Sequence, residues 1–367
     1  MAERYKPYIN IGPGDMIRDE LAALNWTQED LSSIVGMTPK AINEILTNKS
    51  AITIETARLL NKALGPSAQF WLNADASYRL RLESDHKNEK EAETKALIYK
   101  YMPIREMVKK RWLKQSKNVN ALVKEVKEFW EIDKLDFSFM DEAELPNFRK
   151  SDAYNQYNSY YAQCWYKKAK KSALEFKVER YSKKKLKELS HRINLFTVRD
   201  GGIKIFIKEL NSIGVKFFVL PHLQKTYIDG ASFFDGDNPV IVTTCRYNRN
   251  DNFWFTIAHE IAHILLHLKK GECFLDNLEK LDSPKEREAD DLASGMLKVN
   301  EVLNFFKGKT RYISRRQISE CSDEQKIVPG IIVGVLQFYG KMSRKNLNRF
   351  KETIIEKIPG NYFIGKY

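Results

Sequence analysis

Residues 255–267, Phe-Thr-Ile-Ala-His-Glu-Ile-Ala-His-Ile-Leu-Leu-His, constrain the fold more than any other segment of the chain. The apolar residues around the polar ones predict a buried helix within Phe253–Leu268. Positions four apart lie on one face of a helix, so His259 and His263 offer two imidazole nitrogens to one cation. Glu260 lies beside the first histidine, where it can act as a general base on a water molecule. The alternative is a chance occurrence of this spacing in a structural helix.

A catalytic zinc ion takes three protein ligands, so a third ligand must come from another segment. A second predicted helix, Pro284–Val299, carries Glu286 and Asp290 on one face. We expect Glu286 to be the third ligand of one zinc ion per chain, with Glu288 as the second choice. Asp290 is expected to hold the free nitrogen of a ligand histidine. His267 is expected to be structural or to support a ligand.

The N-terminal part of the chain predicts a series of short helices. Thr27-Gln28-Glu29-Asp30 has the form of a capping box, Gly36 ends that helix, and Thr38-Pro39 can open the next one. This is the spacing of a helix-turn-helix, whose second helix enters the major groove. The alternative is a helical bundle that contacts only protein. The expected DNA-contacting residues are Thr38, Lys40 and Asn43 on the second helix, with Lys40 and Asn43 suited to base edges, and Gln28 and Lys49 for phosphates.

Charge-dense residues 84–98 predict a domain boundary. We therefore expect a multidomain chain with an all-α helix-turn-helix domain at 1–84, a helical linker or partner-binding region at 85–192, and an α+β domain at 193–367. Val215–Leu220 and Val240–Thr244 are rich in β-branched residues and predict strands. Val240–Thr244 fits either an edge strand that binds a substrate backbone or an interior strand.

The net charge of +13 is unevenly distributed. Residues 1–85 carry 9 Lys and Arg against 11 Asp and Glu, whereas residues 86–190 carry 25 against 16. The basic excess thus lies outside the predicted DNA-binding domain, which predicts weak non-specific binding to DNA. The basic run Lys167–Lys187 fits either a nucleic-acid contact or a solvated helical face.

No membrane partner is expected, because apolar stretches such as Ile331–Leu336 are too short to cross a bilayer. The sequence shows no secretion signal, and its four cysteines are scattered as in a reducing compartment. We therefore expect a cytoplasmic protein.

Four segments within residues 11–83 form a recognisable set: Pro13-Gly14-Asp15-Met16, Thr27-Gln28-Glu29-Asp30-Leu31, Asn43-Glu44-Ile45-Leu46-Thr47-Asn48-Lys49 and Ser67-Ala68-Gln69-Phe70-Trp71-Leu72-Asn73. By these segments the region resembles the Xre-type antitoxins of the HigA/VapI group. The resemblance implies binding to double-stranded operator DNA as a homodimer.

Three segments within residues 195–340 belong together: residues 255–267, the helix from Glu286 to Asp290, and Pro329–Gln337. By these segments the region resembles the ImmA/IrrE family of metallopeptidases. The resemblance implies a zincin-like, zinc-dependent endopeptidase that cleaves a repressor protein, with Glu260 as the catalytic base.

Three functional hypotheses follow. The first is an operator-binding regulator of a toxin–antitoxin, phage or stress-response locus with a working peptidase. The second is an antitoxin-like repressor whose metal domain only binds a toxin or repressor partner. The third is a peptidase whose helical N-terminus is a docking module.

Overall fold

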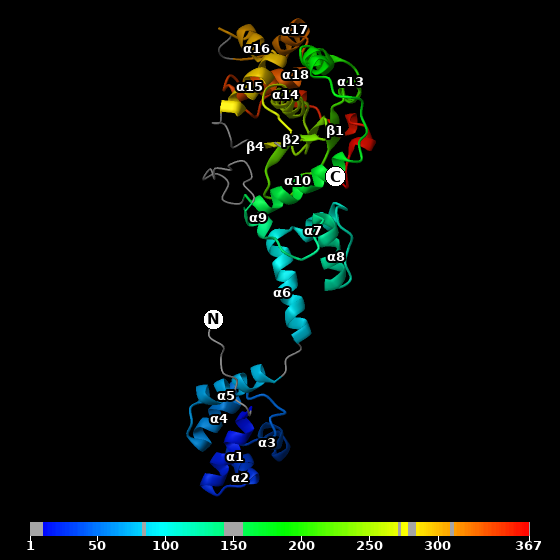
Figure 1. Cartoon of the computed structure of the whole chain (residues 1–367). Coiled ribbons are helices and arrows are strands. Elements are labelled where there is room, and N and C mark those ends of the chain that lie inside the picture. Colours follow the sequence, from blue (N-terminus) through cyan, green and yellow to red (C-terminus); the bar gives the residue numbers. More distant parts are fainter. Residues whose placement is uncertain are drawn as a thin grey trace. The chain divides into compact units, whose positions relative to one another are not determined.

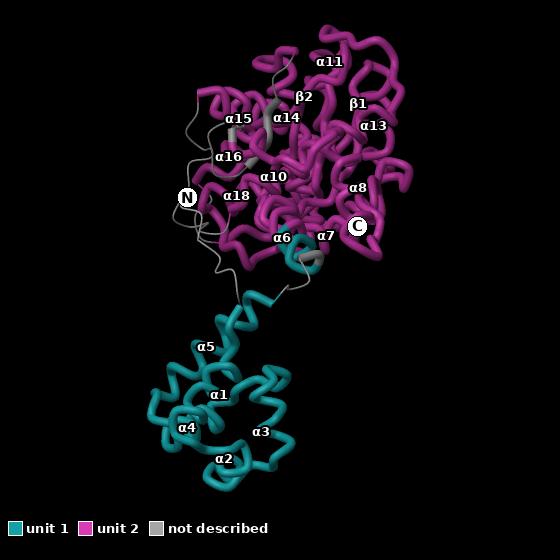
Figure 2. Tube along the Cα trace, turned by 60° about the horizontal axis from the view of Figure 1, so that its bottom comes forward, with its two compact units in different colours: residues 1–93 teal, residues 94–367 magenta. Residues whose placement is uncertain are grey.

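The computed structural model describes residues 10–82, 86–142, 157–270, 273–277, 284–308 and 312–366. The chain forms two compact units, residues 1–93 and 94–367 (Figure 2). The boundary expected between residues 84 and 85 lies outside the described residues. Within the described ranges, no helix combines the length and the apolar character needed to cross a membrane.

The first unit is helical, as expected from its capping signals. Thr27 caps its helix through a reciprocal pair of hydrogen bonds with Asp30. Gly36 ends that helix with φ of 67°, and the Thr38 hydroxyl caps the next one by accepting from the Ala41 amide. Its helices are α1 (Pro13–Leu24), α2 (Gln28–Val35), α3 (Pro39–Leu46), α4 (Ile54–Leu64) and α5 (Ala68–Arg81), with the start of α6 (His86–Tyr101).

The core of the first unit is made of its own apolar side chains. Each helix from α1 to α5 contributes a residue that is at most 1% exposed. These residues are Ile17, Leu31, Ile42, Leu60 and Trp71.

The second unit contains a mixed sheet with strand order β1-β3-β2-β4. β3 runs parallel to β1, and β2 runs antiparallel to both β3 and β4. Because β1 and β2 flank β3, the expectation that Val240–Thr244 is an edge strand is wrong and the interior alternative is confirmed. The strands are β1 (Lys216–Val219), β2 (Ile228–Asp235), β3 (Asn238–Thr243) and β4 (Cys273–Asn277).

Helices cover both faces of the sheet (Figure 1). Phe217 and Ile241 belong to a core on one face, and Phe218 and Val242 to a core on the other. The helices of the first face are α11 (Lys183–Ser190), α12 (Ile193–Val198), α13 (Gly202–Ile213), α14 (Asn250–Leu266), α15 (Pro284–Met296), α16 (Val299–Phe305), α17 (Arg315–Gln325) and α18 (Pro329–Phe338). Those of the second face are α6, α7 (Ile104–Lys109), α8 (Val119–Trp130), α9 (Ser138–Glu142) and α10 (Ser159–Ala173).

In residues 85–192, expected to be a helical linker or partner-binding region, the described residues are mainly helical; α6–α10 share a core with one face of the sheet, and α11 packs on the other face. Trp165 on α10 donates from Nε1 to the Leu220 carbonyl at 3.4 Å, and the Tyr166 ring lies against Phe233 of β2. Helices α6–α10 therefore form one layer of the second unit. In the basic run, Lys167 and Lys171 form ion pairs with Glu131, so part of its charge is neutralised.

The C-terminal segment covers the outer side of β1. Phe363 forms a parallel bridge with Val219, and the Ile364 amide donates to the Val219 carbonyl at 2.9 Å. The segment also contains the short 3₁₀ helices Asn348–Phe350, Ile355–Lys357 and Gly360–Tyr362.

Candidate metal centre and nucleic-acid interface

α14 is a buried helix with polar groups on one face. Its apolar residues Ile257, Ala258 and Ile261 are fully buried. His259 and His263 are 3% and 1% exposed, one helical turn apart. α14 packs against α15, which brings the carboxylates of α15 to the two imidazoles.

Three ligand-type atoms converge between α14 and α15. His259 Nε2 lies 2.9 Å from His263 Nε2, and Glu286 Oε2 lies 3.2 Å and 3.4 Å from these two nitrogens. A tetrahedral zinc with ligands near 2.0–2.1 Å separates its ligand atoms by about 3.3 Å. The three atoms therefore have the spacing of one face of a zinc coordination sphere.

The hydrogen bonds at the Nδ1 atoms of His259 and His263 fix the tautomer of each ring and leave Nε2 facing this point. The Asp290 carboxylate can only accept, so His259 donates from Nδ1 at 2.8 Å and keeps a lone pair on Nε2. Glu288 accepts in the same way from His267 Nε2 at 2.9 Å. His267 Nδ1, at 3.2 Å, then accepts from His263 Nδ1, which leaves a lone pair on His263 Nε2.

Two imidazole lone pairs and a carboxylate oxygen directed at one point repel each other unless a cation lies between them. The donor set of two nitrogens and one oxygen is one that zinc accepts. The residues present therefore fit a divalent metal, with His259, His263 and Glu286 as its ligands.

The pKa values of the ligands favour the forms that bind a metal. Burial lowers the pKa of His263 and outweighs the neighbouring Glu286 carboxylate, which raises it, so the imidazole is neutral at pH 7. Burial raises the pKa of Glu286, but the adjacent imidazoles of His259 and His263 outweigh it and lower this pKa to about 2. A neutral imidazole and an ionised carboxylate are the species that coordinate metals.

Glu260 lies on α14 between the two histidines and is fully buried. Its carboxylate lies against the backbone of β2 at Gly230. A Cβ atom at Gly230 would come within 2.8 Å of Glu260 Oε1 and 2.7 Å of Thr256 Cγ2. The pairing register between β2 and β4 shifts between Ile228 and Gly230, an irregularity of the kind that β-bulges produce near active sites.

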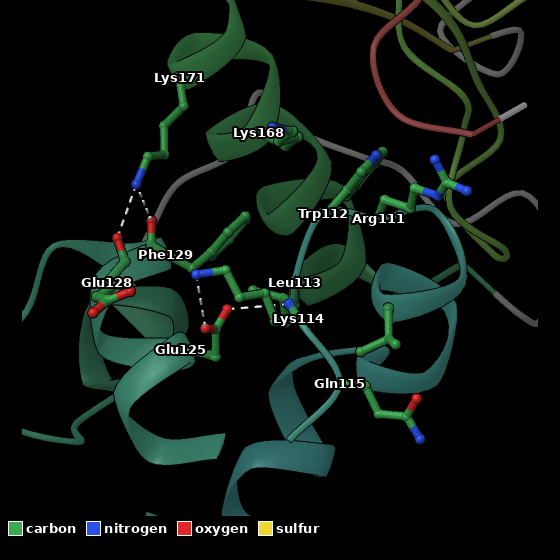
Figure 3. A pocket seen from close by; sticks show the side chains of 11 residues that line it. Arg111, Trp112, Leu113, Lys114, Gln115, Glu125, Glu128, Phe129, Lys168 and Lys171 are labelled. Atoms are coloured by element: carbon green, nitrogen blue, oxygen red, sulfur yellow. Dashed lines mark hydrogen bonds and ion pairs between the residues drawn. The ribbon is translucent and has the colours of Figure 1, made fainter. Parts of the chain in front are cut away.

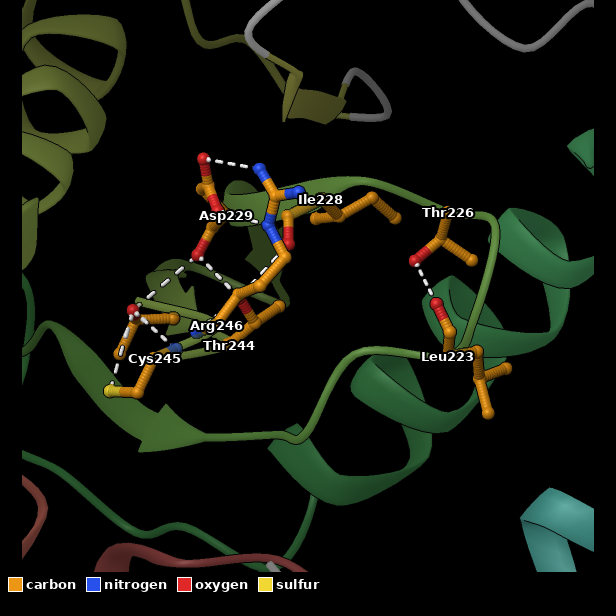
Figure 4. Close-up of polar contacts among 8 residues, drawn as sticks. Leu223, Thr226, Ile228, Asp229, Thr244, Cys245 and Arg246 are labelled. Atoms are coloured by element: carbon orange, nitrogen blue, oxygen red, sulfur yellow. Dashed lines mark hydrogen bonds and ion pairs between the residues drawn. The ribbon is translucent and has the colours of Figure 1, made fainter. Parts of the chain in front are cut away.

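Asp229, the residue of β2 that precedes Gly230, is held by a forked ion pair with Arg246 (Figure 4). Arg246, in the segment between β3 and α14, donates from Nε and Nη2 to Asp229 at 2.8 Å and 3.1 Å. The Asp229 carbonyl accepts from the Thr244 amide at 2.9 Å. Asp229 is 2% exposed, so this pair ties the strand and the segment leading into α14 together in a dry setting.

The structure brings together the residues that the sequence assigns to the metal site. Glu286 meets both histidines, and Asp290 contacts His259. Glu288, the second choice for the third ligand, contacts His267 instead, which is a role we did not expect. Gly230 and Asp229 were also missed, although a glycine inside an apolar strand is a known sign of close backbone approach.

The helix-turn-helix surface lies on α2 and α3 of the first unit. Ile42, Ile45 and Leu46 turn the apolar side of α3 into the core. The five residues proposed to contact DNA are all exposed: Gln28, Thr38, Lys40, Asn43 and Lys49. The Thr38 hydroxyl caps α3 by accepting from the Ala41 amide, so Thr38 also fixes where this helix begins.

Comparison with known families gives two matches. Residues 17–70 match the helix-turn-helix family. Residues 199–303, which include β1–β4, α14 and α15, match the family of the IrrE N-terminal-like domain.

Curated relatives and solved structures match the N-terminal part. Virulence-associated protein I of Dichelobacter nodosus is 33% identical over 78 residues, which is 21% of this chain and 72% of that protein. The uncharacterized HTH-type transcriptional regulator YddM of Escherichia coli is 34% identical over 68 residues, 18% of this chain and 72% of that protein.

Among solved structures, the HigA-family addiction module antidote protein of Coxiella burnetii is 26% identical, with a TM-score of 0.21. The match covers 23% of this chain and 92% of the antidote protein. Pseudomonas aeruginosa antitoxin HigA with the higBA promoter is 25% identical, with a TM-score of 0.21, covering 22% of this chain and 90% of its own. From its matched segments, the chain belongs to the Xre-type helix-turn-helix proteins, and it carries a C-terminal metallopeptidase-family domain of the IrrE N-terminal-like type.

Proposed function

We propose that this chain is a DNA-binding transcriptional regulator with a zinc-dependent endopeptidase domain. In this proposal it controls a toxin–antitoxin, phage or stress-response locus by binding operator DNA and by cleaving a regulatory protein. The convergence of His259 Nε2, His263 Nε2 and Glu286 Oε2 within 3.4 Å of one another carries the peptidase part.

The chain's own residues supply the remaining parts of a hydrolytic site. A bound zinc ion would polarise the scissile carbonyl and make a water molecule more acidic. Glu260 takes the proton from the attacking water and later delivers it to the leaving amine. Asp290, and Glu288 through His267, hold the ligand imidazoles in the required tautomers. The buried surroundings of α14 exclude bulk water from the site.

The peptidase proposal is tested by co-expression with the products of neighbouring genes, followed by metal analysis and a search for a cleaved partner. Glu260→Gln is expected to retain about one zinc per chain and to lose cleavage about a hundredfold or more, because the general base is gone. Glu301→Gln, at an exposed glutamate, is the matched control and should cleave as the wild type does. Cleavage by Glu260→Gln would exclude this role for Glu260, and a wild-type chain that takes up no metal would exclude the peptidase.

The DNA-binding proposal is supported by the helix-turn-helix match and by the relative named as a transcriptional regulator. An electrophoretic shift assay on the gene's own upstream DNA tests it. Asn43→Ala is expected to weaken operator binding by about 1–3 kcal/mol and to relax specificity at one base pair. Lys49→Ala is expected to weaken binding to all sequences, whereas Lys62→Ala, on exposed α4 surface, should change nothing.

We further propose that the chain binds its operator as a homodimer, as the antitoxin resemblance implies. Light scattering on the purified chain would then report twice the mass of 42.8 kDa.

The Glu260→Gln variant also separates two modes of regulation. Regulation that is unchanged in this variant would indicate that the metal domain binds a partner without cleaving it.

A further inference from the structure

A cavity of about 630 Å³ lies in the helical layer on the sheet face opposite α14 (Figure 3). Its walls come from the segment Arg111–Gln115 after α7, from α8 and from α10. All three segments belong to the second unit. The volume is within the range of about 300–1,000 Å³ typical of small-molecule sites.

Some charged side chains of this cavity have hydrogen-bond or ion-pair partners, and others have none. Glu125 accepts from the Lys114 amide at 3.1 Å and pairs with the Lys114 ammonium, and Glu128 pairs with Lys124 outside the cavity. Lys171 donates to the Glu128 carbonyl at 2.8 Å and pairs with Glu131. These side chains therefore have counter-charges or acceptors of their own.

Two further cations line the same cavity without such partners. In the part of the chain that the structure describes, the side chains of Arg111 and Lys168 form neither a hydrogen bond nor an ion pair. Lys168 is half-buried, and burial lowers the pKa of its ammonium more than the charge of Glu175 raises it, with a further lowering from Lys171. A half-buried ammonium that lacks a counter-ion is unfavourable, so the cavity has the electrostatic character of an anion site.

We propose that this cavity binds a small molecule that carries a phosphate group, with Lys168 and Arg111 holding the phosphate. A phosphate with a charge near −2 matches two unpaired cations, and the guanidinium of Arg111 can bind two of its oxygens. Leu113 and Phe129 provide an apolar wall for the remainder of the ligand. The volume of about 630 Å³ suits a ligand of nucleotide size.

Titration calorimetry on the full chain tests this proposal with AMP and inorganic phosphate as probes and adenosine as the phosphate-free control. We expect saturable binding of AMP and weaker binding of phosphate, with none of adenosine. Lys168→Met should weaken AMP binding roughly ten- to a hundredfold, the loss of one charge-assisted contact. Lys170→Met, an exposed lysine on the same helix, is the matched control and should bind as the wild type does.

Each alternative outcome has a defined meaning. Failure of both phosphate probes to bind overturns the proposal. Equal binding by the Lys168→Met and Lys170→Met variants places the phosphate elsewhere, such as at the metal centre, and also overturns it. A short DNA duplex that displaces AMP and depends on Lys168 would make the surface a nucleic-acid contact instead. Arg111→Met, at an exposed residue, provides a second variant if Lys168→Met unfolds at a lower temperature.

Discussion

Asp290 and its neighbour Asp291 differ in what their carboxylates contact. Asp290 accepts from His259, whereas Asp291 is exposed.

The spacing of His259 and His263 on α14, and of Glu286 and Asp290 on α15, was predictable, because a helix of fixed pitch determines which residues share a face. The contact between Glu288 and His267 was not, because it depends on how far α15 is rotated and shifted against α14, which no local pattern specifies.

Replacement of Asp290 tests the orientation of the metal ligand. Asp290→Ala should weaken zinc binding about 10- to 100-fold, because His259 loses the partner that fixes its tautomer and ring orientation. Competition with a chromophoric chelator measures this affinity. Asp291→Ala, the matched control, should bind zinc as the wild type does, and equal affinities for the two variants would contradict the role given to Asp290.

Replacement of Gly230 tests the position of Glu260. Gly230→Ala places a Cβ 2.8 Å from Glu260 Oε1, so the carboxylate must move. We expect zinc content to be retained and kcat for a cleaved partner to fall about tenfold or more, because small misplacements of a catalytic group are costly. Unchanged kcat at full zinc occupancy would show that Glu260 does not need this space.

Among the elements, the helices were predictable and half of the sheet was not. Capping residues such as Thr27 and Thr38 mark helix starts in the sequence itself. β1 and β3 have β-branched or aromatic runs, whereas β2 contains Gly230 and is buried on both faces, so it lacks the alternation that marks a strand. The cover that α6–α10 provide for one face of the sheet also escaped prediction, because it joins residues far apart in the chain, such as Trp165 and Leu220, which are 55 positions apart.

α15 carries a glycine whose replacement should stabilise the helix that supplies Glu286. Gly295 is exposed, and a Cβ there would meet no atom within 4 Å. Gly295→Ala should raise the free energy of unfolding of the second unit by about 0.5–1 kcal/mol, because alanine loses less backbone entropy in a helix. Denaturant unfolding measures this change, and a lower stability of the variant would mean that the position is not open in solution.

On the scale of the whole molecule, the core of the helix-turn-helix unit and the cores of the second unit share no residue among those that the structure describes. The first comprises side chains from Ile17 to Trp71, and the two cores around the sheet comprise side chains from Ile98 onward. The charge is divided similarly, since the first 85 residues are slightly acidic and the rest of the chain carries the basic excess. We therefore expect the two units to unfold as separate cooperative transitions.

Metal removal should consequently affect one transition only. Bound zinc at about 100 times its Kd stabilises a native unit by about 2.7 kcal/mol, provided that the unfolded chain does not bind it. In differential scanning calorimetry of the full chain, EDTA should lower the Tm of the larger transition and leave the smaller one in place. The Asp290→Ala variant should respond to EDTA less than the Asp291→Ala variant at the same zinc concentration. A joint shift of both transitions would show that the first unit depends on the second for its stability. If EDTA shifts neither transition, a bound metal does not stabilise the folded chain.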